Sequence, residues 1–93
     1  MSKQAPLTGA VALQYDGAGA PRVSAKGQGV VAEKILELGR RHDIPLYEDP
    51  DLLALLARVE LGEEIPYALY VAVAEVIAFA YLVSGKAGQA QDA

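Results

Sequence analysis

The stretch AVALQYDGAGAPRVSAK, residues 10–26, decides how this chain begins to fold. Its first part, residues 10–15, is short and apolar and has a glycine close to each end, which is typical of a mostly buried strand. Its last part, residues 22–26, alternates between polar and apolar side chains and predicts a second strand. The connection between them is rich in glycine, so the stretch predicts a β-hairpin.

A helix is predicted to follow the hairpin, over residues 30–41. Gly27 and Gly29 interrupt the second strand just before it. Apolar side chains then recur at the spacing of one helix face, namely Val31, Ile35 and Leu38. Glu37 precedes Arg41 by four residues, which is the better orientation for an ion pair on a helix.

The apolar run at residues 44–48 predicts a third strand. A strand, a helix and a further strand form a βαβ unit, so the second and third strands are expected to be parallel neighbours. Asp49 and Pro50 then have the pattern of a helix N-cap followed by a proline at the first helical position. We expect the helix that they begin to end at Gly62.

The last helix is predicted to begin near residues 63–66 and to run to about residue 83. Residues 66–83 are apolar except for Glu75, and a central carboxylate disfavours a membrane span, so the segment is interpreted as a core helix that buries most of its circumference. Its expected buried side chains are Tyr70, Val73, Ile77 and Ala80, with Leu69 and Val76 beside them. The expected solvent side contains Ala68, Ala72 and Glu75.

These elements predict an α/β fold with a small mixed sheet of about three to four strands flanked by three or four helices. Residues 10–83 form the expected domain. Residues 1–9 are an N-terminal segment, and residues 84–93 have the composition of a flexible tail.

Composition excludes several classes of function. The chain has 93 residues, enough for one small core, and 53% of them are hydrophobic, which favours a folded chain. Its net charge of −4 gives no field that would attract nucleic acid, and neither nucleic-acid binding nor membrane insertion is expected. Cysteine is absent from the sequence, so disulfides and thiolate metal sites are excluded. The N-terminus lacks the apolar region of a signal peptide, and a cytoplasmic location is expected.

Two glycines give the strongest hint of a ligand site. Gly27 and Gly29 lie between a predicted strand and a predicted helix, and Glu48 follows about 20 residues later, which is similar to a dinucleotide-binding pattern. A chain with room for one βαβ unit cannot build the full binding crevice of such proteins. The favoured interpretation is a turn that needs the backbone freedom of glycine, and no cofactor is predicted.

The remaining candidates for chemistry have simpler explanations. His42 has no recognisable nucleophile to activate and is interpreted as a residue that caps a helix. Acidic residues that could bind a metal fit helix initiation better, and these are Glu48, Asp49, Asp51, Glu63 and Glu64. The sequence therefore predicts no catalytic residues and no metal site.

Read together, the segments resemble the cytoplasmic domain of the FlhB/YscU/SpaS family of flagellar and type III secretion proteins. The resemblance covers about residues 6–82 and is most specific in two blocks, residues 20–27 (APRVSAKG) and residues 62–76 (GEEIPYALYVAVAEV). Full members of the family carry four transmembrane helices ahead of this domain. In them an Asn-Pro-Thr-His motif cleaves itself before the proline, and the domain acts in switching export from one class of substrate to the next.

Three features of the chain depart from the family pattern. The membrane part is absent, and the position of the family's Pro-Leu-Ala-Arg region is occupied by residues 51–54 (DLLA). The cleavage motif aligns with Ala5, Pro6, Leu7 and Thr8. Ala5 has no carboxamide and Thr8 cannot replace the histidine, so self-cleavage is not expected. The chain begins five residues before Pro6 and resembles the family's C-terminal cleavage fragment made as a separate product.

The resemblance also implies a binding edge. In the family fold, as we interpret it, a strand from the N-terminal fragment belongs to the same sheet as the first strand of this chain. That first strand would then offer an open edge to a partner, formed by Ala10, Val11, Ala12, Leu13, Gln14 and Tyr15. Expected partners are export-gate proteins or the N-terminal fragment of a full-length relative. Two alternatives stay open: a nucleotide-binding protein that uses Gly27 and Gly29, and a relic of the fold with a role outside export.

Overall fold

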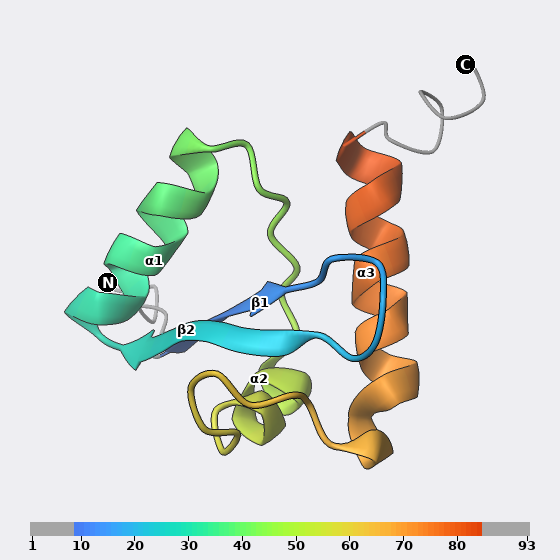
Figure 1. Cartoon of the computed structure of the whole chain (residues 1–93). Helices are drawn as coiled ribbons and strands as arrows, with labels where there is room; N and C mark the ends of the chain where they lie inside the picture. The colour runs from blue at the N-terminus through green and yellow to red at the C-terminus, as the bar shows by residue number, and fades with distance from the viewer. Residues whose placement is uncertain (1–8, 85–93) are drawn as a thin grey trace.

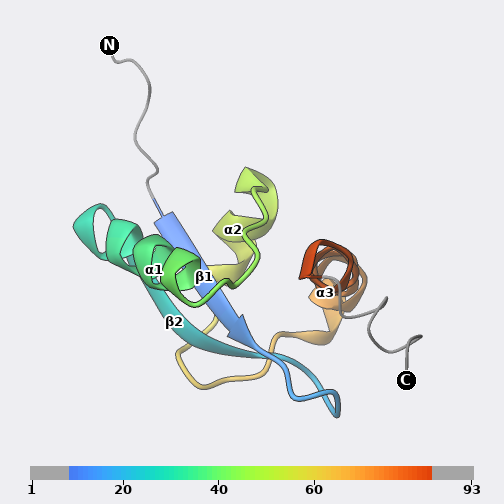
Figure 2. The same cartoon turned by 90° about the horizontal axis from the view of Figure 1, so that it is seen from above.

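The computed structural model describes residues 9–84, which form a β-hairpin and three helices. The elements are β1 (Gly9–Gln14), β2 (Arg22–Gln28), α1 (Val30–Arg41), α2 (Pro50–Leu56), a 3₁₀ turn η1 (Tyr67–Leu69) and α3 (Tyr70–Ser84). Helices α1 and α2 lie on opposite sides of the hairpin, and α3 stands at one side of the molecule (Figures 1 and 2). The predicted α/β class is confirmed. The predicted tail at residues 84–93 and the degenerate cleavage motif lie almost wholly outside the described residues.

The hairpin is antiparallel, as predicted, and its register contains a bulge. Ala12 pairs with Ala25, but the next residue of β1, Leu13, pairs with Val23. Ser24 is therefore an extra residue on β2, and its hydroxyl donates a hydrogen bond to the carbonyl of Ala12 at 3.2 Å. Bulges of this kind bend a strand and increase its twist.

The outer edge of β2 is covered at its first residues by the segment that leads to α3. The backbone N–H of Val23 donates to the carbonyl of Glu63 at 3.0 Å, and the carbonyl of Val23 accepts from Gly62 N at 2.8 Å. Ile65 N donates to the carbonyl of Pro21 at 2.9 Å. Glu63 and its neighbour Glu64 thus belong to a strand-like contact with β2, and the prediction that they begin a helix was wrong.

The predicted third strand is also absent from the described residues. Residues 44–49 connect α1 to α2 without forming a ladder, and the sheet in this part of the chain has two strands, both antiparallel. Pro45 lacks a backbone N–H for pairing. Side chains hold the connector instead: the rings of Tyr47 and Phe79 meet edge to face with centroids 5.1 Å apart. The expected βαβ unit and parallel pairing were therefore wrong.

Helix α1 has the predicted bounds, but a different face packs on the hairpin. Its buried residues are Ala32 and Gly39, two small residues that let the helix approach closely. Val31 and Leu38, two of the three expected core residues, are about half exposed at 52% and 51%. The predicted ion pair between Glu37 and Arg41 is present at 3.1 Å on the exposed surface, where it contributes little to stability.

Helix α2 begins as predicted and ends earlier. The Asp49 carboxylate accepts a hydrogen bond from Leu52 N at 3.1 Å, with Pro50 at the first helical position. The helix ends at Leu56, and residues 57–59 continue as a turn in which Arg58 N donates to the carbonyl of Leu55 and Val59 N to that of Leu56. Gly62, the predicted end, lies in a second turn, where its φ of 84° suits glycine.

Helix α3 begins at Tyr70, after η1, and only one of its sides is covered. Val73 is 1% exposed and packs with Leu52, Leu56 and Ile65 in the buried cluster. Partly buried side chains around this cluster come from several elements, among them Val11, Leu13, Leu69, Ala72, Val76 and Ile77. The expectation that α3 buries most of its circumference was wrong. Tyr70 is 42% exposed, whereas Ala72 packs against the core.

The C-terminus of α1 is closed by a Schellman motif with an unusual residue. Asp43 N donates to the carbonyl of Arg40 at 3.1 Å, and Ile44 N donates to that of Gly39 at 2.8 Å, which is the bonding pattern of this motif. Asp43 occupies the left-handed position with φ 59°, the one non-glycine residue with positive φ among residues 9–84. His42 precedes it as the C-cap and bonds through its backbone N–H.

Asp43→Gly is expected to raise the free energy of unfolding by about 0.5–1 kcal/mol. Glycine avoids the steric cost of the left-handed conformation, although it loses more backbone entropy on folding. The change also removes a carboxylate from the negative end of the α1 dipole. Urea unfolding followed by circular dichroism measures the effect. Asp43→Ala is the control and should not stabilise; a glycine variant less stable than the wild type would contradict this account.

Candidate partner-binding site

The backbone groups of β1 divide into an inner and an outer set. Val23 directs both its N–H and its C=O away from β1, to Glu63 and Gly62, so its pair with Leu13 is a non-hydrogen-bonded one. Leu13 then also directs its N–H and C=O away from the hairpin. Because backbone direction alternates along a strand, Gly9 and Val11 do the same. We call these groups the β1 edge.

The β1 edge has no backbone partner within residues 9–84. The backbone hydrogen bonds outside the regular elements involve β2, α1, α2 and the loops, and none of them reaches Gly9, Val11 or Leu13. Six consecutive residues of β1 carry no charge and no proline, and the bulge of the hairpin is on β2. Charged side chains, proline and bulges are the features that usually protect a strand edge from pairing, and β1 has none of them. The β1 edge is therefore open and unprotected in the described structure.

The side chains of β1 are fixed even though its edge is open. Val11 and Leu13 pack against the buried cluster, and Ala10 is 6% exposed. The predicted edge residue Tyr15 lies beyond the end of the strand and is 40% exposed. A partner strand would thus pair with a β1 backbone that is already held in its extended conformation.

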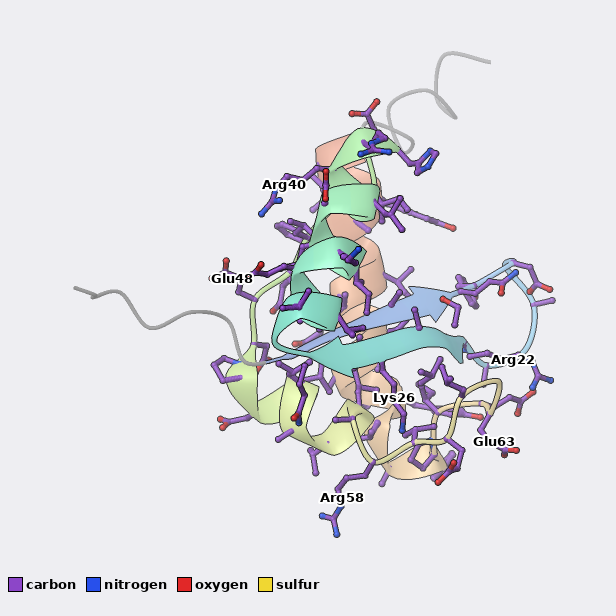
Figure 3. The ribbon with its side chains drawn as sticks, turned by 90° about the vertical axis from the view of Figure 1, so that its left-hand side faces the viewer. Arg22, Lys26, Arg40, Glu48, Arg58 and Glu63 are labelled. Atoms are coloured by element: carbon purple, nitrogen blue, oxygen red, sulfur yellow. The ribbon has the colours of Figure 1, made fainter. Side chains whose placement is uncertain are left out.

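Lys26 holds the hairpin to α2, a role that the sequence interpretation missed. Its ammonium donates to the carbonyl of Ala57 at 3.0 Å and to that of Val59 at 2.7 Å, just after the end of α2. Figure 3 shows the side chain running from β2 toward this turn, whereas Arg58 projects away from the body of the molecule. A cation at this place also interacts favourably with the negative end of a helix. An isolated lysine at a strand end gives no sequence signal for such a contact.

Arg22 forms a second link between the hairpin and the turn after α2. Its guanidinium donates to the carbonyl of Gly62 at 2.9 Å and pairs with Glu64 at 3.2 Å. Both side chains are about half exposed, so the ion pair itself contributes little. The pair with Arg22 gives Glu64 a structural role, so neither metal binding nor helix capping is needed to account for this residue.

The two glycines of the nucleotide-like pattern have structural reasons. A Cβ on Gly27 would collide with the side chain of Val31, so the strand and α1 approach too closely for any other residue there. Gly29 precedes α1 with φ 57°, in the left-handed region. The two strands that are described run antiparallel, and a dinucleotide crevice needs parallel strands. Nothing in this arrangement supports nucleotide binding.

The remaining candidate residues are dispersed. His42, Glu48 and Asp51 are exposed, and Asp49 serves as the N-cap of α2. Within residues 9–84, no three side chains of the histidine, cysteine, aspartate or glutamate type gather as a metal site would need. Across the same residues, no helix combines the length and the apolar character needed to cross a bilayer. Residues 5–8 lie outside the described part of the chain.

A sequence model of the family described as the FlhB HrpN YscU SpaS Family matches residues 4–80. The chain belongs to this family. The flagellar biosynthetic protein FlhB of Yersinia enterocolitica is 53% identical over 79 residues, which are 82% of this chain and 21% of that protein. Protein YlqH of Bacillus subtilis (strain 168) is 41% identical over 83 residues, covering 87% of this chain and 89% of YlqH. The chain thus spans about a fifth of the length of the FlhB relatives that it matches.

Solved structures of the FlhB family share the fold. The crystal structure of the cytoplasmic domain of FlhB from Shewanella putrefaciens has a TM-score of 0.77 and 35% identity, covering 86% of this chain and 69% of that one. The crystal structure of the PscU C-terminal domain has a TM-score of 0.71 and 27% identity, covering 80% of this chain and 98% of that one. The resemblance inferred from the sequence is confirmed, and with it the relation to flagellar and type III protein export.

Lys26→Met is expected to lower the free energy of unfolding by about 1–3 kcal/mol. Methionine keeps the apolar stem but leaves the carbonyls of Ala57 and Val59 without their charged donor. Lys34→Met is the matched control, because Lys34 is exposed on α1 and its loss should change stability by less than about 0.5 kcal/mol. Thermal and urea unfolding of both variants measure the difference. Equal stabilities of the two variants would show that the Lys26 contacts add nothing.

Proposed function

We propose that this chain is a non-catalytic interaction module of flagellar or type III protein export, acting in the cytoplasm and taking part in the switch of export substrates. It docks on a protein of the export gate by accepting a strand at the β1 edge. The observation that carries the proposal is the row of unpaired backbone groups on Gly9, Val11 and Leu13. Strand addition uses such an edge for affinity and neighbouring side chains for specificity.

The partner that fits best is the N-terminal fragment of a full-length FlhB relative. In the family, cleavage leaves that fragment associated with a domain of the present kind, through a strand of the shared sheet. The chain matches only about a fifth of such relatives, in their C-terminal part by the family pattern. The uncharged β1 edge favours a strand without charges, because an unpaired charge at a new strand pair would lose hydration.

The connector between α1 and α2 supports the same proposal. Residues 44–47 are apolar, yet they have no strand partner among the described residues. Ile44 and Leu46 are 58% and 41% exposed. A sheet completed by an added strand would give this segment a larger apolar surface to pack on.

The binding experiment uses the cytoplasmic stub of the Yersinia enterocolitica FlhB, truncated at the Asn of the family's cleavage motif. Calorimetry should show a 1:1 complex with a Kd in the micromolar range. Val11→Pro removes an outward N–H without touching the ladder to β2, and proline is tolerated at an edge of this kind. We expect it to weaken binding by at least about tenfold, since one lost hydrogen bond and a ring at the interface both oppose pairing.

Val11→Ala is the matched control for this experiment. It removes most of the same side chain but keeps the N–H, so its affinity should stay within about threefold of the wild type. Circular dichroism of both variants checks that the hairpin is retained. Unchanged binding of Val11→Pro would place the contact elsewhere, and absence of any complex at micromolar concentration would reject docking on this fragment.

The proposal includes the absence of self-cleavage, because Ala5 occupies the position of the nucleophilic Asn. The peptide bond between Ala5 and Pro6 is expected to stay intact over days at neutral pH. Intact-mass spectrometry should find the full chain of 9.8 kDa and no fragment that begins at Pro6. A fragment with that N-terminus, formed in protease-free buffer, would contradict the loss of this chemistry.

A further inference from the structure

The outward side of α3 carries a nearly uncharged surface that the rest of the described chain leaves uncovered. Five residues form it at helical spacing over three turns: Val71, Ala74, Glu75, Ala78 and Leu82. Val71 is 76% exposed and Leu82 is 73% exposed. We call these residues the outer stripe. Figures 1 and 2 both show α3 as the outermost element on its side of the molecule.

The outer stripe is distinct from the part of α3 that packs on the core. Val73 points into the buried cluster, and Val76 and Ile77 pack beside it. On a helix, Val73 is about 160° from Val71, so the stripe lies on the opposite side. An exposed apolar face that is continuous over three turns is typical of a surface that binds a partner.

Glu75 gives the stripe a specific charge. It is exposed in the middle of α3 and has neither a hydrogen bond nor an ion pair with any residue in the described part of the chain. No cation is present on α3 itself. A partner that covers the stripe must therefore neutralise one carboxylate within an otherwise apolar contact.

We propose that the outer stripe binds an amphipathic helix whose apolar face carries one lysine or arginine. Ala74 and Ala78 are small and let a partner helix approach the α3 backbone, while Val71 and Leu82 pack at the two ends. The cation of the partner pairs with Glu75 at the centre. This surface is independent of the β1 edge, so the proposal does not rest on strand addition.

Two other occupants fit the stripe less well. Pairing with α3 of a second copy would bring two Glu75 carboxylates into the same apolar contact, where like charges repel. A membrane surface would meet a face that has an acidic residue and no lysine or arginine, the reverse of what anionic lipid attracts. A helix with a complementary cation satisfies both the apolar side chains and the charge.

The test is a selection from a displayed library of helical peptides in which the positions of one face are randomised. The full chain serves as bait, in parallel with its Glu75→Lys variant. Peptides from the wild-type selection should be apolar on that face with lysine or arginine at its centre, and those from the variant should carry aspartate or glutamate there. Each pool should bind its own bait at least about tenfold more tightly than the other bait.

A double variant, Val71→Ser with Leu82→Ser, controls for the site, since both side chains are on the surface and their loss should leave the fold intact by circular dichroism. It should bind the wild-type pool at least about tenfold more weakly. The proposal is overturned if no peptide is enriched over bait-free panning, if both baits select the same charge, or if the double variant binds normally. A dimer mass that Leu82→Ser abolishes, or sedimentation with anionic vesicles, would assign the stripe to a second copy or to a membrane instead.

Discussion

The attachment of Val23 to the segment before α3 is the contact on which the rest of this structure depends. The side chain of Val23 is fully buried, and its backbone N–H and C=O bond to residues about forty positions later in the chain. Burial of a valine contributes about 1.5–3 kcal/mol and each hydrogen bond about 0.5–1.5 kcal/mol. This contact covers the outer edge of β2 at its first residues, brings Ile65 into the core and sets where α3 begins. It also makes this end of the hairpin asymmetric, because Leu13, which lies opposite Val23, has no corresponding cover among residues 9–84.

Asymmetry of this kind is consistent with the association proposed above. In the described residues the buried cluster is small, and large apolar side chains remain at the surface of α1, α3 and the connector. A small domain has little core to spare, so surface that stays apolar in isolation indicates contacts made with other molecules. The β1 edge and the outer stripe are on different elements and differ in kind, one of backbone groups and the other of side chains. The chain belongs to the FlhB family, and its named relatives include flagellar biosynthetic proteins.

Local signals in the sequence predicted the local structure well. The bounds of α1, the hairpin and the cap on Asp49 all depend on residues close together in the chain, and all three were confirmed. Features that depend on distant contacts were missed. α2 stops before Gly62, and Lys26 binds the carbonyls of Ala57 and Val59 just after its end. Glu64 pairs with Arg22 rather than starting a helix.

The predicted third strand failed for a related reason, because pairing needs a neighbour that the described chain does not supply. The candidate edge was predicted from a family resemblance, and the structure adds which of its residues direct their backbone groups outward. The exposed side of α3 was predicted correctly at Glu75 and wrongly at Ala72. A helix that is apolar almost all round has no clear hydrophobic period from which its buried face can be assigned.

The bulge at Ser24 has a consequence for the way the two faces of the hairpin are assigned. Val11 and Leu13 are two residues apart and share a face, but their partners Lys26 and Val23 are three apart. In a regular strand, residues three apart point to opposite faces. The inserted residue restores the phase, so that the buried valine and the lysine that binds the turn after α2 act on the same side. A single extra residue thus keeps Val23 and Lys26 on one face of the hairpin although they are three residues apart.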